Sequence, residues 1–310
     1  MSTLHCGNIT FPSSDRKHTS SAVIYTCPDV PVRAVIQLSH GMCEYVRRYA
    51  PMADFYAAHG IALAGNDHLG HGDTAQAGEH GHYGEKGRPL SSAGRPAYNE
   101  QPAARVFSRP AHHPVRPQHG QLYARWYAEK WPDSITALII SGTAGPSVMN
   151  AIGQRLAALI AAVKGNDAVS PLMVNLNFGS YCKRIPDAAS PNAWLSRDTQ
   201  VVRDYDADKL CTFSFTAGTY REMLATLNHV SRKSWAEGIA KDLPILLIAG
   251  DADPVGNYGA GVRTVWAMLG DAGVQDLTCQ IYDGARHELH NETNRQEVFD
   301  YVLTWIECHI

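Results

Sequence analysis

Three short segments of the sequence carry groups that could act in acyl transfer. His40–Glu44 begins with a His-Gly turn, whose backbone N–H groups could stabilise a developing oxyanion. Asp251 and Asp253 follow an apolar run, and a carboxylate there could orient a catalytic imidazole. His287 lies in a loop near the end of the chain and could serve as a general base. These segments predict the oxyanion donors, the acid and the base of a hydrolase.

Each of these features taken alone also has an ordinary structural explanation. His-Gly pairs are common, an aspartate after a strand often caps a helix or closes a turn, and a loop histidine is often merely exposed. Their order along the chain carries more weight, because the oxyanion loop comes first, then the acid, then the histidine, each after a predicted strand. This is the order in α/β-hydrolases, where the nucleophile precedes the acid and the acid precedes the histidine.

Short apolar strands that alternate with amphipathic helices would position these loops. Continuous apolar runs bounded by polar turns predict buried strands at Arg33–Ser39, Gly60–Gly65, Ile135–Ser141, Leu243–Ala249 and Leu277–Tyr282. Helical spacing predicts helices at Ala50–His59, Gln121–Lys130 and Gln296–Ile306. Because the strands are apolar throughout, the pattern indicates an α/β fold with a mostly parallel sheet covered by helices on both faces.

The alternation breaks from Gly145 to about Trp235, which predicts an insertion between two parts of the core, residues 1–144 and 236–310. Such insertions commonly lie over the carboxyl edge of the sheet, where ligands bind. We therefore expect residues 145–235 to form a helical cap. The same pattern also fits a few more helices packed on the sheet. The first cap helix carries apolar residues that could line an acyl-chain pocket: Leu156, Leu159, Ile160 and Val163.

Composition excludes several other classes of protein. The chain has 310 residues, of which 45% are hydrophobic and 18% charged, as in folded globular proteins. A net charge of −3 gives no general basic field for nucleic acid. No apolar stretch approaches the ~20 residues that span a bilayer, although peripheral membrane contact through the cap stays open. Seven scattered cysteines without a CxxC pair, and an N-terminus without the apolar part of a secretory signal, favour a reduced, cytoplasmic protein.

The wider sequence around these residues resembles the monoacylglycerol lipase and lysophospholipase branch of the α/β-hydrolases, also described as serine aminopeptidase-like. The resemblance covers nearly the whole chain except about residues 88–121. It rests on His40–Glu44 with Arg48 and Tyr49, Asp67–Gly72, Gly81–Gly84, Tyr123–Arg125, Gly250–Asp253 and Tyr282–Glu288. It implies hydrolysis of a small lipid or another carboxylic ester, without a cofactor. Asp67–Gly72 is expected to be a structural loop beside the site, because its histidines lack a compact metal-ligand spacing.

The resemblance also implies roles for the site residues. Asp253 would be the acid, in preference to Asp251, and His287 would be the base. The oxyanion would be bound by the backbone N–H of Met42 and by that of the residue after the nucleophile, which is His119. In this arrangement the acid holds the imidazole in the required tautomer and stabilises its cation.

The nucleophile that this family requires is absent. A serine should lie in a Gly-x-Ser-x-Gly elbow between a buried strand and a helix, yet alignment by the helix at Gln121–Lys130 puts Gln118 in its place. Ser92 and Ser108 lie in the anomalous segment of residues 88–121 without the context of an elbow, and the side chain of Cys43, in the oxyanion loop, is expected to point elsewhere. A triad without its nucleophile is nearly inactive.

The strand that should precede the elbow is also difficult to recognise. Residues 88–121 contain six of the 17 prolines of the chain, and three of these lie in Pro110–Pro117. Proline cannot donate to a ladder and is nearly excluded from central strands. We therefore expect a loop over a damaged sheet at this position.

Two compensating frameshifts, one near residues 88–100 and one near 121, would account for this anomalous segment. Val115–Gln121 can be encoded by GTT CGG CCA CAG CAT GGG CAG, and the same bases read one position later give Phe-Gly-His-Ser-Met-Gly. That string contains the missing elbow. The alternative is a divergent relative with a true glutamine, and the encoding DNA would distinguish the two.

Three functions fit this sequence. The first is a serine ester hydrolase lineage acting on monoacylglycerols, lysophospholipids or similar esters, impaired in the chain as written. The second is a non-catalytic protein that binds acyl lipids and keeps the pocket. The third is an aminopeptidase or another α/β-hydrolase chemistry, which would need a selective pocket for the substrate amine. The acyl-chain length and the oligomeric state do not follow from the sequence.

Overall fold

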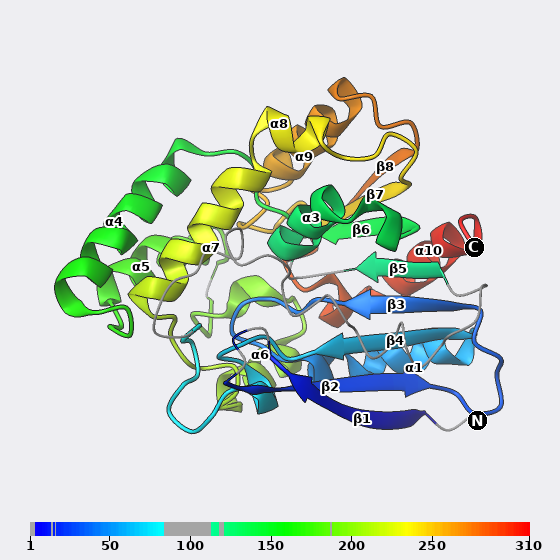
Figure 1. The fold of residues 1–310 in the computed structure, drawn as a ribbon, viewed down its shortest axis with the longest axis horizontal. Coiled ribbons are helices and arrows are strands. Elements are labelled where there is room, and N and C mark those ends of the chain that lie inside the picture. The colour runs from blue at the N-terminus through cyan, green and yellow to red at the C-terminus, as the bar shows by residue number, and fades with distance from the viewer. Residues whose placement is uncertain (1–3, 14, 16, 84–112, 118–120, 187) are drawn as a thin grey trace.

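A computed structural model describes residues 4–13, 15, 17–83, 113–117, 121–186 and 188–310. Its central feature is an eight-stranded sheet of order β1-β2-β4-β3-β5-β6-β7-β8 (Figure 1). The strands are β1 His5–Pro12, β2 Thr19–Thr26, β3 Ala34–Leu38, β4 Ile61–Asn66, β5 His113–Pro117, β6 Ala137–Ser141, β7 Ile245–Gly250 and β8 Leu277–Tyr282. The pairings of β2 with β1 and with β4 are antiparallel, and all the others are parallel.

The apolar runs of the sequence become the middle of this sheet. Every residue of β3, β6 and β7 is buried, as expected for parallel strands covered on both faces. The antiparallel strands β1 and β2 were not predicted. Along β1 the side chains largely alternate between exposed and partly buried. In β2 the apolar residues are preceded by Ser20 and Ser21. β1 is an edge strand and β2 an inner one, and neither shows the apolar run over its whole length that reveals β3, β6 and β7.

Helices cover both faces of the sheet, so the predicted α/β fold is confirmed. One apolar cluster joins the sheet to α1 (Ala50–Ala58) and α10 (Arg295–Glu307). A second joins it to α3 (Gln121–Lys130), α8 (Lys233–Glu237) and α9 (Ala260–Asp271). The helices α4 (Val148–Lys164), α5 (Pro171–Phe178), α6 (Thr199–Ala207) and α7 (Ala217–Val230) lie beyond the carboxyl ends of the parallel strands (Figure 1).

Local capping explains where these four helices begin. In each, the residue before the first helical position is extended, and its side-chain oxygen accepts a hydrogen bond from a backbone N–H of the first turn. These N-cap residues are Ser147, Ser170, Asp198 and Thr216. Short polar residues therefore mark where each of these helices begins within residues 145–235, the region where the alternation of strands and helices breaks.

The prediction of a loop over a damaged sheet in place of a strand before the elbow is wrong. His113–Pro117 forms β5, which pairs in parallel with β3 and with β6. Its two neighbours present ladders of backbone donors and acceptors on either side, and a strand between them satisfies more of these groups than a loop would. Proline removes a donor at positions 114 and 117 but keeps its carbonyl acceptor. The rest of the anomalous segment, residues 84–112 and 118–120, lies outside the described residues, as do Ser92 and Ser108.

Within the described ranges, no helix is both long and apolar enough to cross a membrane.

Candidate active site

Asp253 and His287 are hydrogen bonded at the carboxyl edge of the sheet. Asp253 follows β7 and His287 follows β8, and the imidazole Nδ1 lies 3.0 Å from the carboxylate Oδ2. The carboxylate is fully buried, and its other oxygen accepts the backbone N–H of Val255 at 2.8 Å. The backbone N–H of His287 donates to the carbonyl of Trp194 at 3.3 Å. Backbone contacts therefore hold both partners in place.

The electrostatics of this pair favour a basic histidine. Burial by itself lowers the pKa of His287, but the charge of Asp253 and its hydrogen bond outweigh burial, so the pKa is raised above its usual value. An imidazole whose cation is stabilised by a buried carboxylate can accept a proton from a nucleophile and later return it to a leaving group.

Asp251 lies two residues from Asp253 but has a different partner. Its Oδ1 accepts the backbone N–H of Gly284 at 2.7 Å, at the turn that begins the histidine loop. Gly284 has a φ of +64°, in the region that favours glycine. Asp251 therefore shapes the loop that carries His287, whereas Asp253 contacts the imidazole.

Gly142 leaves room for the Asp253–His287 pair. It follows β6 with a φ of +59°. A Cβ on Gly142 would lie 2.9 Å from Nδ1 and Cε1 of His287 and 3.3 Å from Oδ2 of Asp253. Both the backbone conformation and the close approach of the imidazole therefore require glycine here.

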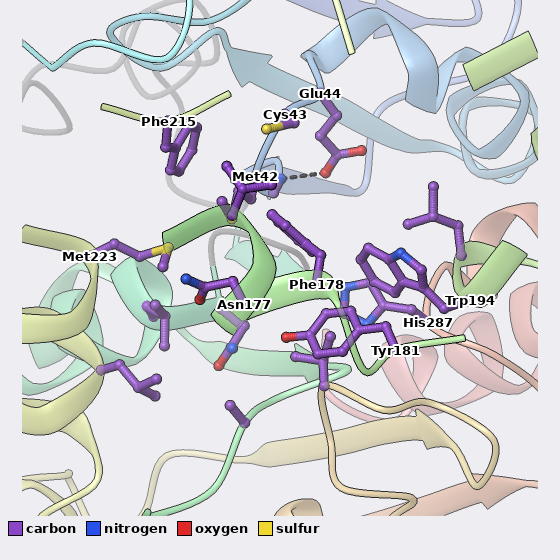
Figure 2. Close-up of a pocket in the computed structure, with 18 of the residues that line it drawn as sticks. Met42, Cys43, Glu44, Asn177, Phe178, Tyr181, Trp194, Phe215, Met223 and His287 are labelled. Carbon is purple, nitrogen blue, oxygen red and sulfur yellow. Dashed lines mark hydrogen bonds between the residues drawn. The ribbon is translucent and has the colours of Figure 1, made fainter. Parts of the chain in front are cut away.

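The predicted oxyanion loop is held by hydrogen bonds on both sides of Met42. The backbone N–H of Gly41 donates to the carboxylate of Glu44 (dashed in Figure 2). The backbone N–H of Cys43 donates to Nε2 of His71 at 3.4 Å, and the carbonyl of Cys43 accepts the hydroxyl of Tyr205 at 2.9 Å. Cys43 itself has a φ of +56°. These contacts fix a strained turn that lines the cavity.

The side chain of Cys43 is not placed to act as a nucleophile. Its Sγ donates to the carbonyl of Phe213 at 3.4 Å. Burial, together with the charge of Glu44, raises the pKa of the thiol well above its usual value, so the reactive thiolate is disfavoured.

A buried ionic network joins the His40–Glu44 loop to the loop after β8, which carries His287 and Glu288. Arg48 donates to Glu44 at 2.8 Å and to both carboxylate oxygens of Glu288 at 2.8 and 2.9 Å. Tyr49 donates its hydroxyl to Glu44 at 2.8 Å. Burial raises the pKa of Glu44 to about 7, and repulsion from Glu288 adds to this although Arg48 opposes it. For Glu288, burial acts in the same direction, but the charge of Arg48 prevails and holds the pKa low.

The histidines of Asp67–Gly72 are packed as a structural cluster. The ring centroids of His40 and His68 lie 4.0 Å apart, and those of His40 and His71 lie 5.1 Å apart. Burial lowers the pKa of His68 to about 4 and that of His71 to about 3, so both are neutral at pH 7. Asp67 accepts backbone N–H groups of Val46 and Asp73, which ties this loop to the segment after β3.

A cavity of about 1120 Å³ connects these groups. Met42, Phe215 and Met223 give it an apolar side, while Trp194, Tyr181 and Phe178 surround His287 (Figure 2). The ring of Trp194 lies 5.1 Å from that of His287 and 4.9 Å from that of Tyr181. The histidine therefore faces a space that is large enough for a lipid-sized ligand.

The four residues predicted for the acyl pocket do not line this cavity. Leu159 and Val163 are 61% and 75% exposed, and Leu156 and Ile160 pack against a cluster around Phe215. The buried stripe of α4 is Ala157 and Ala161, which are small. α7 packs against α4 and contributes larger apolar side chains to the lining of the cavity, Met223, Leu224 and Leu227. Gln118 and His119, predicted for the nucleophile position and the oxyanion hole, lie outside the described residues.

The chain is similar to known lipases and esterases over most of its length. A family model described as "Serine aminopeptidase, S33" matches residues 30–88 and 119–294. The chain belongs to this family. A monoacylglycerol lipase of Mycolicibacterium smegmatis is 27% identical, over 91% of each chain, and a monoglyceride lipase homolog of Monkeypox virus is 26% identical, over 91% of this chain and 92% of that one. A thermostable carboxyl esterase of Bacillus coagulans, solved in complex with glycerol, has a TM-score of 0.89 at 28% identity over 99% of each chain.

Membership of the S33 family identifies the fold as that of an α/β-hydrolase and the lineage as that of lipases and esterases. The family match omits residues 89–118. This gap lies within the segment whose composition departs from both flanks.

Several residues that shape the site of this S33 protein were not given a role from the sequence. Arg48 and Glu288 stand in the motifs quoted above, but nothing in their spacing reveals that they meet across 240 positions. Trp194 and Tyr205 come from the cap region, where the pattern is weak. Gly142 carries one usable signal, because a glycine directly after a buried strand often marks a close approach.

Proposed function

We propose that this chain derives from a serine ester hydrolase that acts on monoacylglycerols or similar uncharged acyl esters. The observation that carries the proposal is the Asp253–His287 pair, which faces a lipid-sized cavity beside the Met42 loop. His287 would accept the proton of the nucleophile and donate it to the leaving alcohol, while Asp253 would hold the imidazole and stabilise its cation.

The oxyanion would be stabilised by backbone donors. The N–H groups of Met42 and His119 would bind the developing charge, and the contacts on either side of Met42 would keep its N–H in position without reorganisation. The ester carbon would then lie between these donors and the position of Gln118, where the nucleophile is expected.

An uncharged head group fits the cavity better than a phosphate. Among the described residues that line it there is no lysine or arginine, and phosphate recognition usually relies on such groups. The two glutamates that line it, Glu44 and Glu288, are both bound by Arg48. This supports monoacylglycerols over lysophospholipids. It also argues against an aminopeptidase, because neither carboxylate is left to receive a substrate amine.

We propose further that the cap contacts lipid surfaces. Large apolar side chains that are at least half exposed gather on α4, α5 and the segment between them: Val148, Met149, Ile152, Leu159, Val163, Val169, Leu172 and Leu176. A patch of this kind on a water-facing surface favours contact with an apolar partner. For an ester hydrolase, that partner would be the lipid aggregate that contains its substrate.

The chain as written should turn over very slowly. Loss of a triad nucleophile lowers kcat by about 10⁶-fold, and a glutamine cannot replace the serine. The frameshift hypothesis for residues 88–121 is supported by the gap in the family match. If instead Gln118 is native, the preserved cavity favours a protein that binds acyl lipids without hydrolysing them.

Hydrolysis of p-nitrophenyl esters of several chain lengths tests this proposal. The chain as written is compared with a variant that restores the elbow through Val115→Phe, Arg116→Gly, Pro117→His, Gln118→Ser and His119→Met. The matched control adds His287→Ala to that variant. We expect turnover from the restored variant only, and its loss in the control. Comparable turnover from the chain as written would overturn the elbow argument, and inactivity of both would favour the lipid-binding function.

A further inference from the structure

Arg125 is a fully buried arginine whose partners, among the described residues, include no carboxylate. It lies in α3, the helix that begins three residues after Gln118. Burial lowers the pKa of its guanidinium to about 9, which still leaves the group charged at neutral pH. A buried charge without a counterion is unfavourable unless its donors are satisfied. The acceptors of its two terminal nitrogens, Nη1 and Nη2, therefore have to offset this cost.

The guanidinium binds two segments that are far apart in the sequence. Its Nη1 donates to Oγ1 of Thr143 at 2.9 Å and to the carbonyl of Ala144 at 3.2 Å. Its Nη2 donates to the carbonyl of Val230. The ring of Trp235 lies 4.3 Å below the guanidinium carbon, and the indole N–H donates to the backbone carbonyl of Arg125 at 2.9 Å.

These two segments are the connections of the cap. Thr143 and Ala144 lie between β6 and α4, where the chain leaves the sheet. Val230 is the last residue of α7, where the chain returns toward α8 and β7. In Figure 1, α3 lies beside β6, and α7 runs toward it from the cap. One side chain therefore binds both ends of a long insertion.

The entry connection is held on a second side as well. The hydroxyl of Thr143 donates to Oε1 of Gln121, the first residue of α3. Two residues further on, a Cβ on Gly145 would lie 2.8 Å from Cα of Gly261 in α9. The chain thus passes through a narrow gap between α3 and α9, which leaves the entry connection little freedom to move.

We propose that Arg125 is a positioning residue that clamps the two connections of the cap against α3 and so sets the place of α7 over the cavity. A planar guanidinium with five donors can reach acceptors on both segments at once, whereas an apolar side chain could fill the space but bind neither. Because Met223, Leu224 and Leu227 of α7 line the cavity, a shift of this helix would change its width.

Hydrogen exchange of the full-length chain tests the clamp without any need for turnover, so failure of the proposed hydrolysis would not affect the result. In Arg125→Met, which keeps much of the side-chain volume, we expect exchange of amides in 143–147 and 229–233 to rise about tenfold or more, while amides of β7 and α10 keep their protection. Arg33→Met is the matched control, because Arg33 is half exposed and pairs with Glu307 far from the cap.

Thr143→Val gives a second, milder test should Arg125→Met fail to fold. It removes one acceptor of Arg125 at the entry connection and leaves the bond to Val230 in place, so exchange should rise in 143–147 and not in 229–233. Binding of 1-O-hexadecylglycerol, an ether that cannot be hydrolysed as an ester, should weaken severalfold in Arg125→Met. Unchanged exchange at both connections, or a uniform rise across β7 and α10, would overturn the clamp.

Discussion

At the scale of single residues, the site depends on contacts that leave little space for change. Gly142 and Asp253 both lie next to Nδ1 of the His287 imidazole. Asp251, only two positions away, is engaged with Gly284. The geometry therefore assigns different tasks to residues that look alike in the sequence.

Gly142→Ala should displace the imidazole of His287. The new Cβ would lie 2.9 Å from two ring atoms, and the φ of +59° adds backbone strain. We expect the restored-elbow variant to lose at least about tenfold in kcat when Gly142 is replaced, since small misplacements of catalytic groups are costly. Gly273→Ala is the matched control: its φ is +91° and its Cβ would meet nothing within 4 Å. Equal losses in both variants would contradict a specific role for Gly142.

Asp253→Asn should lower the pKa of His287. With the carboxylate charge removed, burial becomes the main influence, and burial disfavours the imidazolium. In the folded chain the raised pKa of His287 contributes stability below its unfolded pKa, and this contribution is lost as pH rises through the folded value. Titration of the His287 ring protons by NMR measures the midpoint. Asp251→Asn should shift it much less, and equal shifts would show that the assignment of the acid is wrong.

At the scale of elements, the parallel strands bring three loops to one edge, and side chains then lock these loops together. The loop after β3 and the loop after β8 share Arg48. The cap helix α6 adds Tyr205, which donates to the carbonyl of Cys43. The loop of Met42 is therefore held by contacts from the sheet core and from α6 at the same time.

Glu44→Gln should flatten the pH dependence of stability between about pH 4.5 and 7. Burial raises the folded pKa of Glu44 from its ordinary value to about 7. Its contribution to stability is therefore present at low pH and is lost as pH rises through the folded value. The opposite contribution of Glu288, whose pKa is lowered, changes at more acidic pH. Thermal unfolding across this range should show a smaller fall in Tm for Glu44→Gln than for the exposed control Glu297→Gln. Identical slopes would contradict the shift.

At the scale of the whole molecule, the insertion places an apolar surface beyond the carboxyl edge of the sheet. The exposed face of α4 carries Val148, Leu159 and Val163. An exposed apolar patch on α4, together with the cavity beside His287, supports the proposed contact with a lipid phase.

Replacement of these three residues by serine should weaken binding to vesicles of uncharged phosphatidylcholine that contain monoacylglycerol. Each buried apolar side chain contributes about 1.5–3 kcal/mol when fully removed from water, so we expect a loss of at least tenfold in partitioning, measured by co-sedimentation. Trp266→Ser on α9 is the control for an exposed apolar residue elsewhere. Equal partitioning of the triple variant and the unmodified chain would contradict membrane contact through the cap.

Much of the fold was determined by local sequence. Apolar runs such as Leu243–Ala249 and Gly60–Gly65 become β7 and β4 within one or two residues, because a buried parallel strand needs a continuous apolar stretch. The order of the oxyanion loop, acid and histidine is likewise a property of the chain itself. The absence of an elbow serine is also read from the sequence alone.

Only the tertiary structure decided which of these residues meet. It distinguishes Asp253 from Asp251 by a hydrogen bond to His287, and it forms β5 from a proline-rich stretch because two strands flank the position. It also places Leu159 in solvent, since helical spacing defines a stripe but not the direction in which that stripe faces. Contacts such as Arg125 with Val230 join positions 105 residues apart. They depend on how elements pack, and that information is not local to either segment.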